Sequence, residues 1–200
     1  MQIIVYKFEK IEFSLDDKKT EWNSRYKILD LKKYRSLRLF AHYKKWIDEA
    51  LELLKKKGIK SPICIELACG SAPFSEYLKK KGFRTISSDY SEVVVEKLKF
   101  EGFESYVSDI SSLKELSKFF HLADLVIVSG GIYENSQKDF DKKTFSSIKK
   151  IMSEKGLYLQ IYNVYLTFPN FIKAFIQSYI SYFNIKNWNF LRIFFNKKKL

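Results

Sequence analysis

The sequence predicts an α/β protein with a doubly wound, mostly parallel sheet, an N-terminal helical cap and a short C-terminal part. Short apolar runs rich in β-branched residues alternate with amphipathic segments, which is the order of a parallel sheet with crossover helices. The run 123–129 is continuously apolar, as expected for a central strand buried on both faces. We expect residues 1–58 to form a cap of strand and helix and residues 59–200 to form the core.

The expected elements follow from the spacing of apolar residues. The strands are apolar runs bounded by turn residues: 63–68, 84–88, 104–107, 123–129 and 157–163. The helices carry apolar residues at three- and four-residue steps: 73–81, 92–100, 111–120 and 140–153. Outside this pattern we expect a strand or hairpin within residues 1–14, a helix over 169–182 and an extended segment over 189–195.

The segment 63–73 is the most informative part of the chain. An apolar run containing Glu66 is followed by small residues and then by Pro73, which suits the first turn of a helix. This order of strand, tight turn and helix N-terminus brings a nucleotide cofactor against backbone N–H groups. Asp89 stands nineteen residues after Gly70, at the end of the second expected strand, where a carboxylate can accept hydrogen bonds from ribose hydroxyls.

The run Glu66-Leu67-Ala68-Cys69-Gly70-Ser71-Ala72 resembles the first motif of class I S-adenosylmethionine-dependent methyltransferases. Further elements follow in that family's order, so the resemblance covers roughly residues 60–163. They are Asp89, Ser108-Asp109-Ile110, the segment 123–131 and the segment 155–161. The resemblance implies a Rossmann-like fold, S-adenosyl-L-methionine as the cofactor and methyl transfer as the activity.

The resemblance also implies which residues contact the cofactor. Asp89 would hold the ribose hydroxyls and Asp109 would face the adenine amino group. The full expected set lies at the ends of four strands: Glu66, Ala68, Cys69, Gly70, Ser71, Asp89, Tyr90, Asp109, Ile110, Ser129 and Gly130. The chain departs from the motif at Ala68 and Ala72, which replace its first and third glycines. Glycine is favoured there because it admits positive φ and close backbone approach, and alanine tolerates only the second easily.

The composition fits a single domain without a metal site. The chain has 200 residues, 46% of them hydrophobic, which is enough to bury a core. Cys64 and Cys69 have no second Cys or His pair beside them, and this usage suits a reducing compartment. We see no signal peptide, and polar residues interrupt the most apolar stretch, 157–185, so we expect a cytoplasmic protein without a transmembrane helix.

The net charge of +13 raises the question of nucleic acid. Only five of the 36 basic residues are arginine, the side chain on which phosphate and base recognition relies most. Many of the lysines stand at the expected C-terminal ends of helices, where they favour the helix dipole and solubility. We therefore expect a lysine-coated surface, with nucleic acid as the less favoured partner.

One basic segment stands out from this background. We expect a single helix there, with one apolar stripe, that ends near Gly58: Leu39, Tyr43, Trp46, Ala50 and Leu54. Another flank of the same helix carries Arg35, Arg38 and Lys45, which we expect to face outward and to bind an anionic acceptor. A solvated helix face is the alternative.

Methyl transfer to a hydroxyl also needs a group that removes a proton. Candidates belong near the carboxyl end of the fourth strand, and the loop there supplies Tyr133 and Glu134. His42 on the cap helix is the third candidate, because an imidazole titrates near working pH. Each of the three, taken alone, is more often a structural residue. The loop lacks the Asn/Asp-Pro-Pro-aromatic sequence associated with methylation of base or glutamine amino groups.

Three hypotheses follow for the function. The first is methyl transfer to a small, anionic acceptor, such as the hydroxyl of a sugar or glycan precursor. The second is a nucleic-acid methyltransferase, whose binding would weaken steeply with salt. The third is a catalytically silent relative that serves as a partner protein, which the alanines in the first motif keep open.

Overall fold

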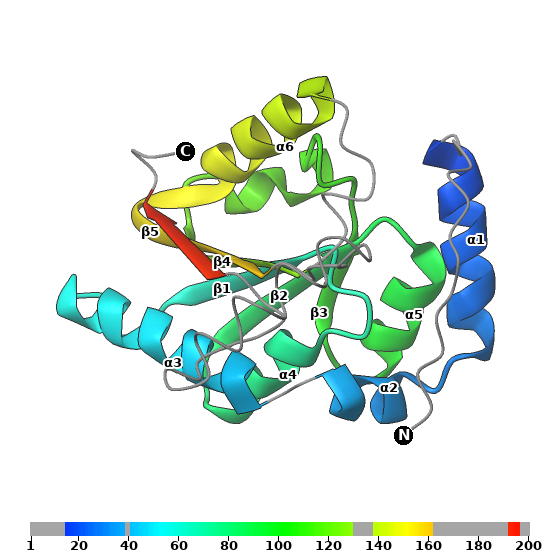
Figure 1. Ribbon diagram of the computed structural model, residues 1–200, viewed down its shortest axis with the longest axis horizontal. Coiled ribbons are helices and arrows are strands. Elements are labelled where there is room, and N and C mark those ends of the chain that lie inside the picture. The colour runs from blue at the N-terminus through cyan, green and yellow to red at the C-terminus, as the bar shows by residue number, and fades with distance from the viewer. Residues whose placement is uncertain (1–14, 39–40, 130–137, 162–191, 197–200) are drawn as a thin grey trace, which may run out of the picture.

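The computed structural model describes residues 15–38, 41–129, 138–161 and 192–196. It contains a six-stranded sheet with the order β3-β2-β1-β4-β5-β6 (Figure 1). The strands are β1 (Ile63–Leu67), β2 (Arg84–Asp89), β3 (Glu104–Val107), β4 (Ala123–Ser129), β5 (Met152–Ile161) and β6 (Arg192–Asn196). The first five are parallel, and β6 is antiparallel to β5. The predicted doubly wound, mostly parallel sheet is therefore confirmed.

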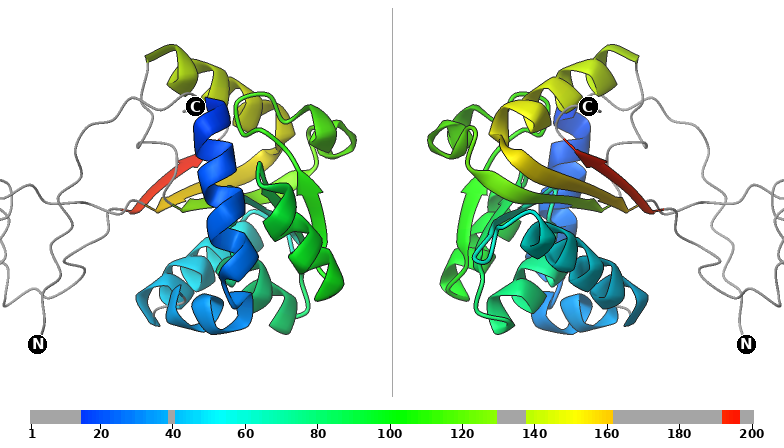
Figure 2. Two further views of the ribbon diagram at one scale, coloured as in Figure 1. Left: turned by 90° about the vertical axis from the view of Figure 1, so that its right-hand side faces the viewer. Right: turned by 90° about the vertical axis from the view of Figure 1, so that its left-hand side faces the viewer.

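Helices cover both faces of this sheet. They are α1 (Leu15–Ile28), α2 (Leu31–Arg38), α3 (Ala41–Lys56), α4 (Pro73–Lys80), α5 (Glu92–Phe100), α6 (Lys138–Ile151) and the 3-10 helix η1 (Lys114–Phe119). The views agree that α6 lies on one side of the sheet and that α3 and α4 lie on the other (Figures 1 and 2). Helix α1 packs against α5, away from the sheet. No helix in the described ranges has both the length and the apolar character needed to cross a lipid bilayer.

The two faces of the sheet have separate apolar clusters, as the two-residue period of a strand requires. Along β4, Leu125 and Ile127 point into the cluster that contains Trp46 of α3. Val126 and Val128 point into the opposite cluster, beside Ile148 of α6. A third cluster joins α1, α2 and α5 around Tyr26, Leu31, Val94, Leu98 and Phe103. This third cluster fixes the N-terminal helices next to the turn that follows β1.

Three expected elements differ in the structure. The segment expected to be helical at 111–120 forms only η1, because Leu113 adopts a left-handed φ of 51° just before it. Strand β5 begins at Met152 instead of 157, since a register irregularity between Ala123 and Leu125 lets the early part of β5 pair with β4. The basic segment, expected to form a single helix, forms two helices, α2 and α3. Of this helix's apolar stripe, Tyr43, Trp46, Ala50 and Leu54 are buried as expected.

Other expectations lie outside the described residues or stay predictions. The elements expected within 1–14 and 169–182 are not described. The extended segment expected over 189–195 is found as β6, which supplies one antiparallel strand at the sheet edge. The division into residues 1–58 and 59–200 stays a prediction. Helix α1 was not expected at all.

Candidate functional site

The turn between β1 and α4 lies where the carboxyl ends of β1, β2 and β4 meet. Three alternate residues of this turn have a left-handed backbone: Ala68 (φ 49°), Gly70 (φ 52°) and Ala72 (φ 55°). Most L-residues avoid this region because their Cβ atom approaches the neighbouring carbonyl oxygen. The turn therefore keeps a glycine-type conformation at all three positions, although alanine occupies two of them.

Glu66 holds the end of this turn that leads into α4. Its side chain is buried, and its Oε2 atom accepts a hydrogen bond from the backbone N–H of Ser75, with a donor–acceptor distance of 2.6 Å. Burial raises the pKa of Glu66 to about 7, an effect that hydrogen bonds from Ser75 and Phe74 and the charge of Arg35 partly offset. The carboxyl group thus satisfies N–H groups in the first turn of α4, which have no partner within the helix.

Asp89 holds the middle of the turn, at Gly70. Its Oδ2 atom accepts the N–H of Gly70 at 2.9 Å, and its Oδ1 atom accepts the N–H of Ser91 at 3.0 Å. Burial raises the pKa of Asp89, and these backbone hydrogen bonds oppose that rise. A carboxylate has about four lone-pair positions, so Asp89 keeps capacity for a further donor while it holds the turn. Asp89 ends β2 as expected, and its hydrogen bond to the glycine turn is a contact that the sequence analysis did not predict.

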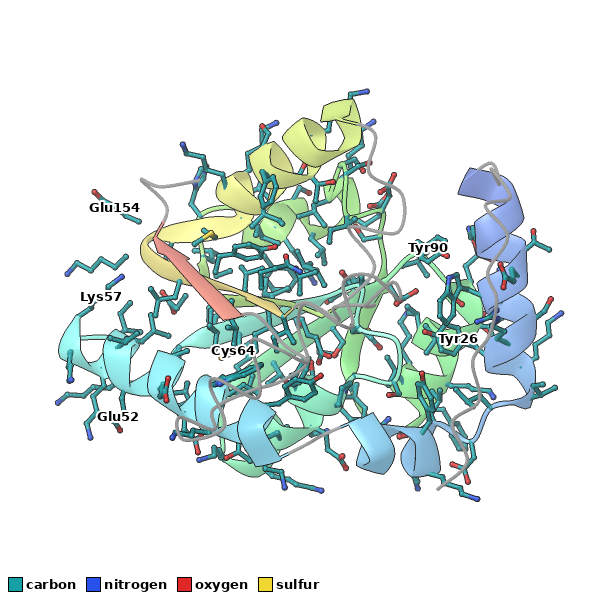
Figure 3. The ribbon with its side chains drawn as sticks, viewed as in Figure 1. Tyr26, Glu52, Lys57, Cys64, Tyr90 and Glu154 are labelled. Atoms are coloured by element: carbon teal, nitrogen blue, oxygen red, sulfur yellow. The ribbon has the colours of Figure 1, made fainter. Side chains whose placement is uncertain are left out.

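Tyr26 of α1 is a site residue that the sequence analysis missed. A Cβ atom placed on Gly70 would lie 2.8 Å from the Tyr26 hydroxyl oxygen, so this hydroxyl stands directly over the turn. Tyr26 stacks on Trp22, and Figure 3 labels it beside α1, with Tyr90 near the start of α5. Helix α1 is also tied to this region by a hydrogen bond from the Ser91 hydroxyl to Asn23. No motif in the sequence marks α1, because its apolar residues are few.

The remaining expected cofactor residues lie around the same turn. Cys69 and Ser71 are buried within it, and burial raises the pKa of the Cys69 thiol well above its usual value. The thiol is therefore neutral. At the end of β3, Asp109 is exposed and accepts two hydrogen bonds at 2.8 Å from the N–H and hydroxyl of Ser111.

Tyr90 and Ile110 are half-buried beside these acids. Ser129 ends β4 as expected, but its side chain and Gly130 lie outside the described part of the chain. The cofactor roles of all these residues stay predictions.

Arg35 does not lie where the sequence predicted. Its side chain is only 3% exposed, and its guanidinium donates hydrogen bonds to the Ser71 carbonyl oxygen and to Glu101. The expectation that Arg35 faces outward is therefore wrong. The physical reason is that α2 ends before α3 begins, so Arg35 is not on the flank of α3 that carries Lys45. Lys45 is exposed, and the Arg38 side chain is not described.

The expected proton acceptors cannot be compared with the geometry. Tyr133 and Glu134 lie outside the described residues, and so does the side chain of His42 at the start of α3. Among the described side chains there is no group of His, Cys, Asp or Glu that could hold a metal ion. Both cysteines are free and buried, and burial raises the pKa of Cys64 to about 12.

No protein-family model and no curated protein matches the chain. Among solved structures, a TehB-like SAM-dependent methyltransferase from Corynebacterium glutamicum is similar, with a TM-score of 0.51 and 14% identity. The match covers 79% of this chain and 80% of that one. A SAM-dependent methyltransferase from Clostridium acetobutylicum is 24% identical, with a TM-score of 0.48, over 64% of this chain and 52% of that one. The first likeness and the strand order show that the chain has the class I methyltransferase fold.

We expect Ala68→Gly to stabilise the protein. Ala68 is half-buried with a φ of 49°, so glycine relieves about 1 kcal/mol of backbone strain, and Tm should rise by about 3 °C. Ala72→Gly should give a smaller rise, because its fully buried methyl group is lost as well. Thermal unfolding measures both.

The reverse change at Gly58 is the matched control for this comparison. Gly58 has a φ of 87°, and a Cβ added there would meet open space, so Gly58→Ala reports the cost of left-handed backbone alone. A fall in Tm for Ala68→Gly would contradict the left-handed conformation at this turn.

Glu66 should make stability fall as pH rises. Above its unfolded pKa of 4.5 the unfolded chain releases the Glu66 proton, while the native protein keeps it up to about pH 7. Stability therefore decreases across this window, by roughly 3 kcal/mol in total, and is constant above it. Glu66→Gln removes the titration, so its stability relative to wild type should grow from pH about 4 to about 8. Urea unfolding at several pH values measures the difference, and a constant difference would contradict the raised pKa.

Proposed function

We propose that this protein is an S-adenosylmethionine-dependent methyltransferase. The observation that carries the proposal is the meeting of Asp89 with the Gly70 turn at the carboxyl edge of a class I sheet. In open α/β sheets, ligands bind at this edge, where the strand order reverses next to β1. The described residues fit the cofactor: a left-handed turn for close approach, a buried acid with capacity for a further donor, and the Tyr26 hydroxyl over Gly70.

The cofactor supplies an electrophilic methyl group, and the protein's task is to place it. Asp89 would accept hydrogen bonds from the ribose hydroxyls, and the N–H groups of the turn would approach the methionine part of the cofactor. Asp109, exposed at the end of β3, would face the adenine amino group. Reaction with an acceptor then needs alignment of the nucleophile with the methyl carbon and the sulfur, which a rigid turn favours. Tyr133, Glu134 and His42 are the candidates for removing the acceptor's proton.

For the acceptor we propose a small molecule with a hydroxyl group and a negative charge. Lys45, which is exposed on α3, supports an anion, whereas Arg35 is occupied by contacts within the protein. Lys45 lines a hollow of about 640 Å³ along α3, together with two more lysines and three carboxylates: Lys44, Lys56, Asp48, Glu49 and Glu52. These carboxylates offset the lysine charge, so one specific contact by Lys45 is favoured over a general anion surface. No described residue favours nucleic acid or a catalytically silent role.

Asp89→Asn should weaken cofactor binding while leaving the fold in place. An asparagine keeps one acceptor oxygen but loses the hydrogen bonds to a charged group, which should cost about 1.5–3 kcal/mol, or about ten- to 150-fold in Kd. Calorimetric titration with S-adenosylhomocysteine measures this. No binding by the wild type at millimolar ligand would mean that the proposed function is wrong.

Asp124→Asn is the matched control. Asp124 also accepts a backbone N–H, from Ile63 at 3.0 Å, and a hydroxyl, from Ser153 at 2.7 Å. It stands at the start of β4, at the opposite edge of the sheet. Its substitution should lower Tm without changing Kd.

Lys45→Glu should lower kcat/KM for an anionic acceptor by about fivefold, because one charged contact is reversed, while the Kd for S-adenosylhomocysteine stays unchanged. The acceptor is found by screening sugar phosphates, nucleotide sugars and neutral sugars for production of S-adenosylhomocysteine. Lys60→Glu, at an exposed position that does not line this hollow, is the control. Turnover of neutral sugars alone would contradict an anionic acceptor.

A further inference from the structure

Arg35 reaches the cofactor turn from α2, a helix outside the sheet. Its Nε–H donates to the carbonyl oxygen of Ser71, and a terminal nitrogen lies 2.8 Å from Glu101 at the end of α5. Its guanidinium carbon lies 4.7 Å from the centre of the Phe103 ring. These partners fix the guanidinium on three sides, and the side chain is nearly inaccessible to solvent. We call Arg35 with Ser71, Glu101 and Phe103 the Arg35 clamp.

The carbonyl that Arg35 holds belongs to the peptide directly before a strained residue. The Ser71 carbonyl and the Ala72 N–H form one planar unit, and Ala72 has a φ of 55°. Rotation of this plane would move Ala72 to the negative φ that alanine prefers. The same rotation would swing the carbonyl away from Arg35 and break the bond from the Ala72 N–H to the Cys69 carbonyl, now 2.9 Å long.

We propose that Arg35 is a positioning residue for the cofactor turn. It locks the Ser71–Ala72 peptide in the orientation that keeps the turn open to the ligand, and so replaces the conformational freedom that a glycine at position 72 would supply. The inference rests on the proposed function for its effect on cofactor binding. Its effect on the turn itself does not depend on any ligand.

The structure also provides a matched control. Arg84 is likewise paired with a carboxylate, Glu104 at 3.2 Å, and lies 5.7 Å from the centre of the Phe119 ring. It makes no contact with the turn among the interactions described. Loss of either arginine removes a ring contact and ion pairing, which for Arg35 involves Glu101 and, at 3.8 Å, Glu76. Only loss of Arg35 frees the Ser71–Ala72 peptide.

The first test uses the protein without ligand. Hydrogen exchange at the amide of residue 72 reports the bond to Cys69, and Arg35→Met should accelerate it by about tenfold, the factor that matches the strain of a left-handed alanine. In an Ala72→Gly background the same substitution should change the exchange by less than about threefold. Arg84→Met should leave this amide unchanged.

The second test measures the Kd for S-adenosylhomocysteine in the same variants, at a temperature where all are folded. Arg35→Met should weaken binding about tenfold in the natural background and less than about threefold in the Ala72→Gly background, whereas Arg84→Met should lower only Tm. A purely stabilising Arg35 would lower Tm and leave the Kd unchanged, and that result would overturn the proposal. Equal losses in the two backgrounds would overturn it as well.

Two further outcomes are separable. Altered exchange at residue 72 without any binding by the wild type would support the positioning role and show that the proposed function is wrong. If Arg35→Met does not fold, Arg35→Lys makes the same comparisons, because lysine keeps the charge beside Glu101 but lacks the planar fork that reaches both partners. An unchanged residue-72 amide in Arg35→Lys would then overturn the proposal.

Discussion

The left-handed turn between β1 and α4 is the constraint on which the candidate site depends. Every second residue of the turn has a positive φ, which alanine avoids, so contacts from other parts of the protein must stabilise this conformation. Three ionisable side chains do this from three different elements: Glu66 from β1, Asp89 from β2 and Arg35 from α2. Each binds a different backbone group of the turn or of the helix that follows it. The shape of the site thus comes from hydrogen bonds between buried polar side chains and the main chain.

Buried charges are costly, and the surrounding structure explains why these are tolerated. Backbone N–H groups at the start of a helix carry partial positive charge and otherwise have no partner, so they favour the carboxyl groups of Glu66 and Asp89. The guanidinium of Arg35 is paired with Glu101 rather than left alone, which avoids the large penalty of an unpaired buried charge. The third apolar cluster, which contains Phe103 and the turn residues Cys69 and Ala72, helps to keep these groups away from water.

The sheet and the core of the site could be predicted from the sequence because both depend on local patterns. Apolar runs between turn residues predicted β1 to β4 to within one residue, and the spacing from Gly70 placed Asp89 at the end of β2. The hydrogen bond between Asp89 and Gly70 was not predicted, because it depends on the conformation of the turn. Tyr26 could not be predicted, because α1 has few apolar residues and its role comes from packing over a distant turn. Arg35 could not either: basic residues are mostly exposed, and its burial depends on Glu101 and Phe103, far along the chain.

Alanine in the left-handed turn also limits the routes by which this sequence can change. A chain with glycine at positions 68 and 72 can gain or lose outside supports freely, because the turn needs none of them. Once alanine is in place, each support becomes difficult to remove before glycine returns. Replacing alanine by glycine first makes the later loss of a supporting side chain harmless, whereas the opposite order is harmful. The residues that support the turn therefore depend on which substitutions in the turn came first.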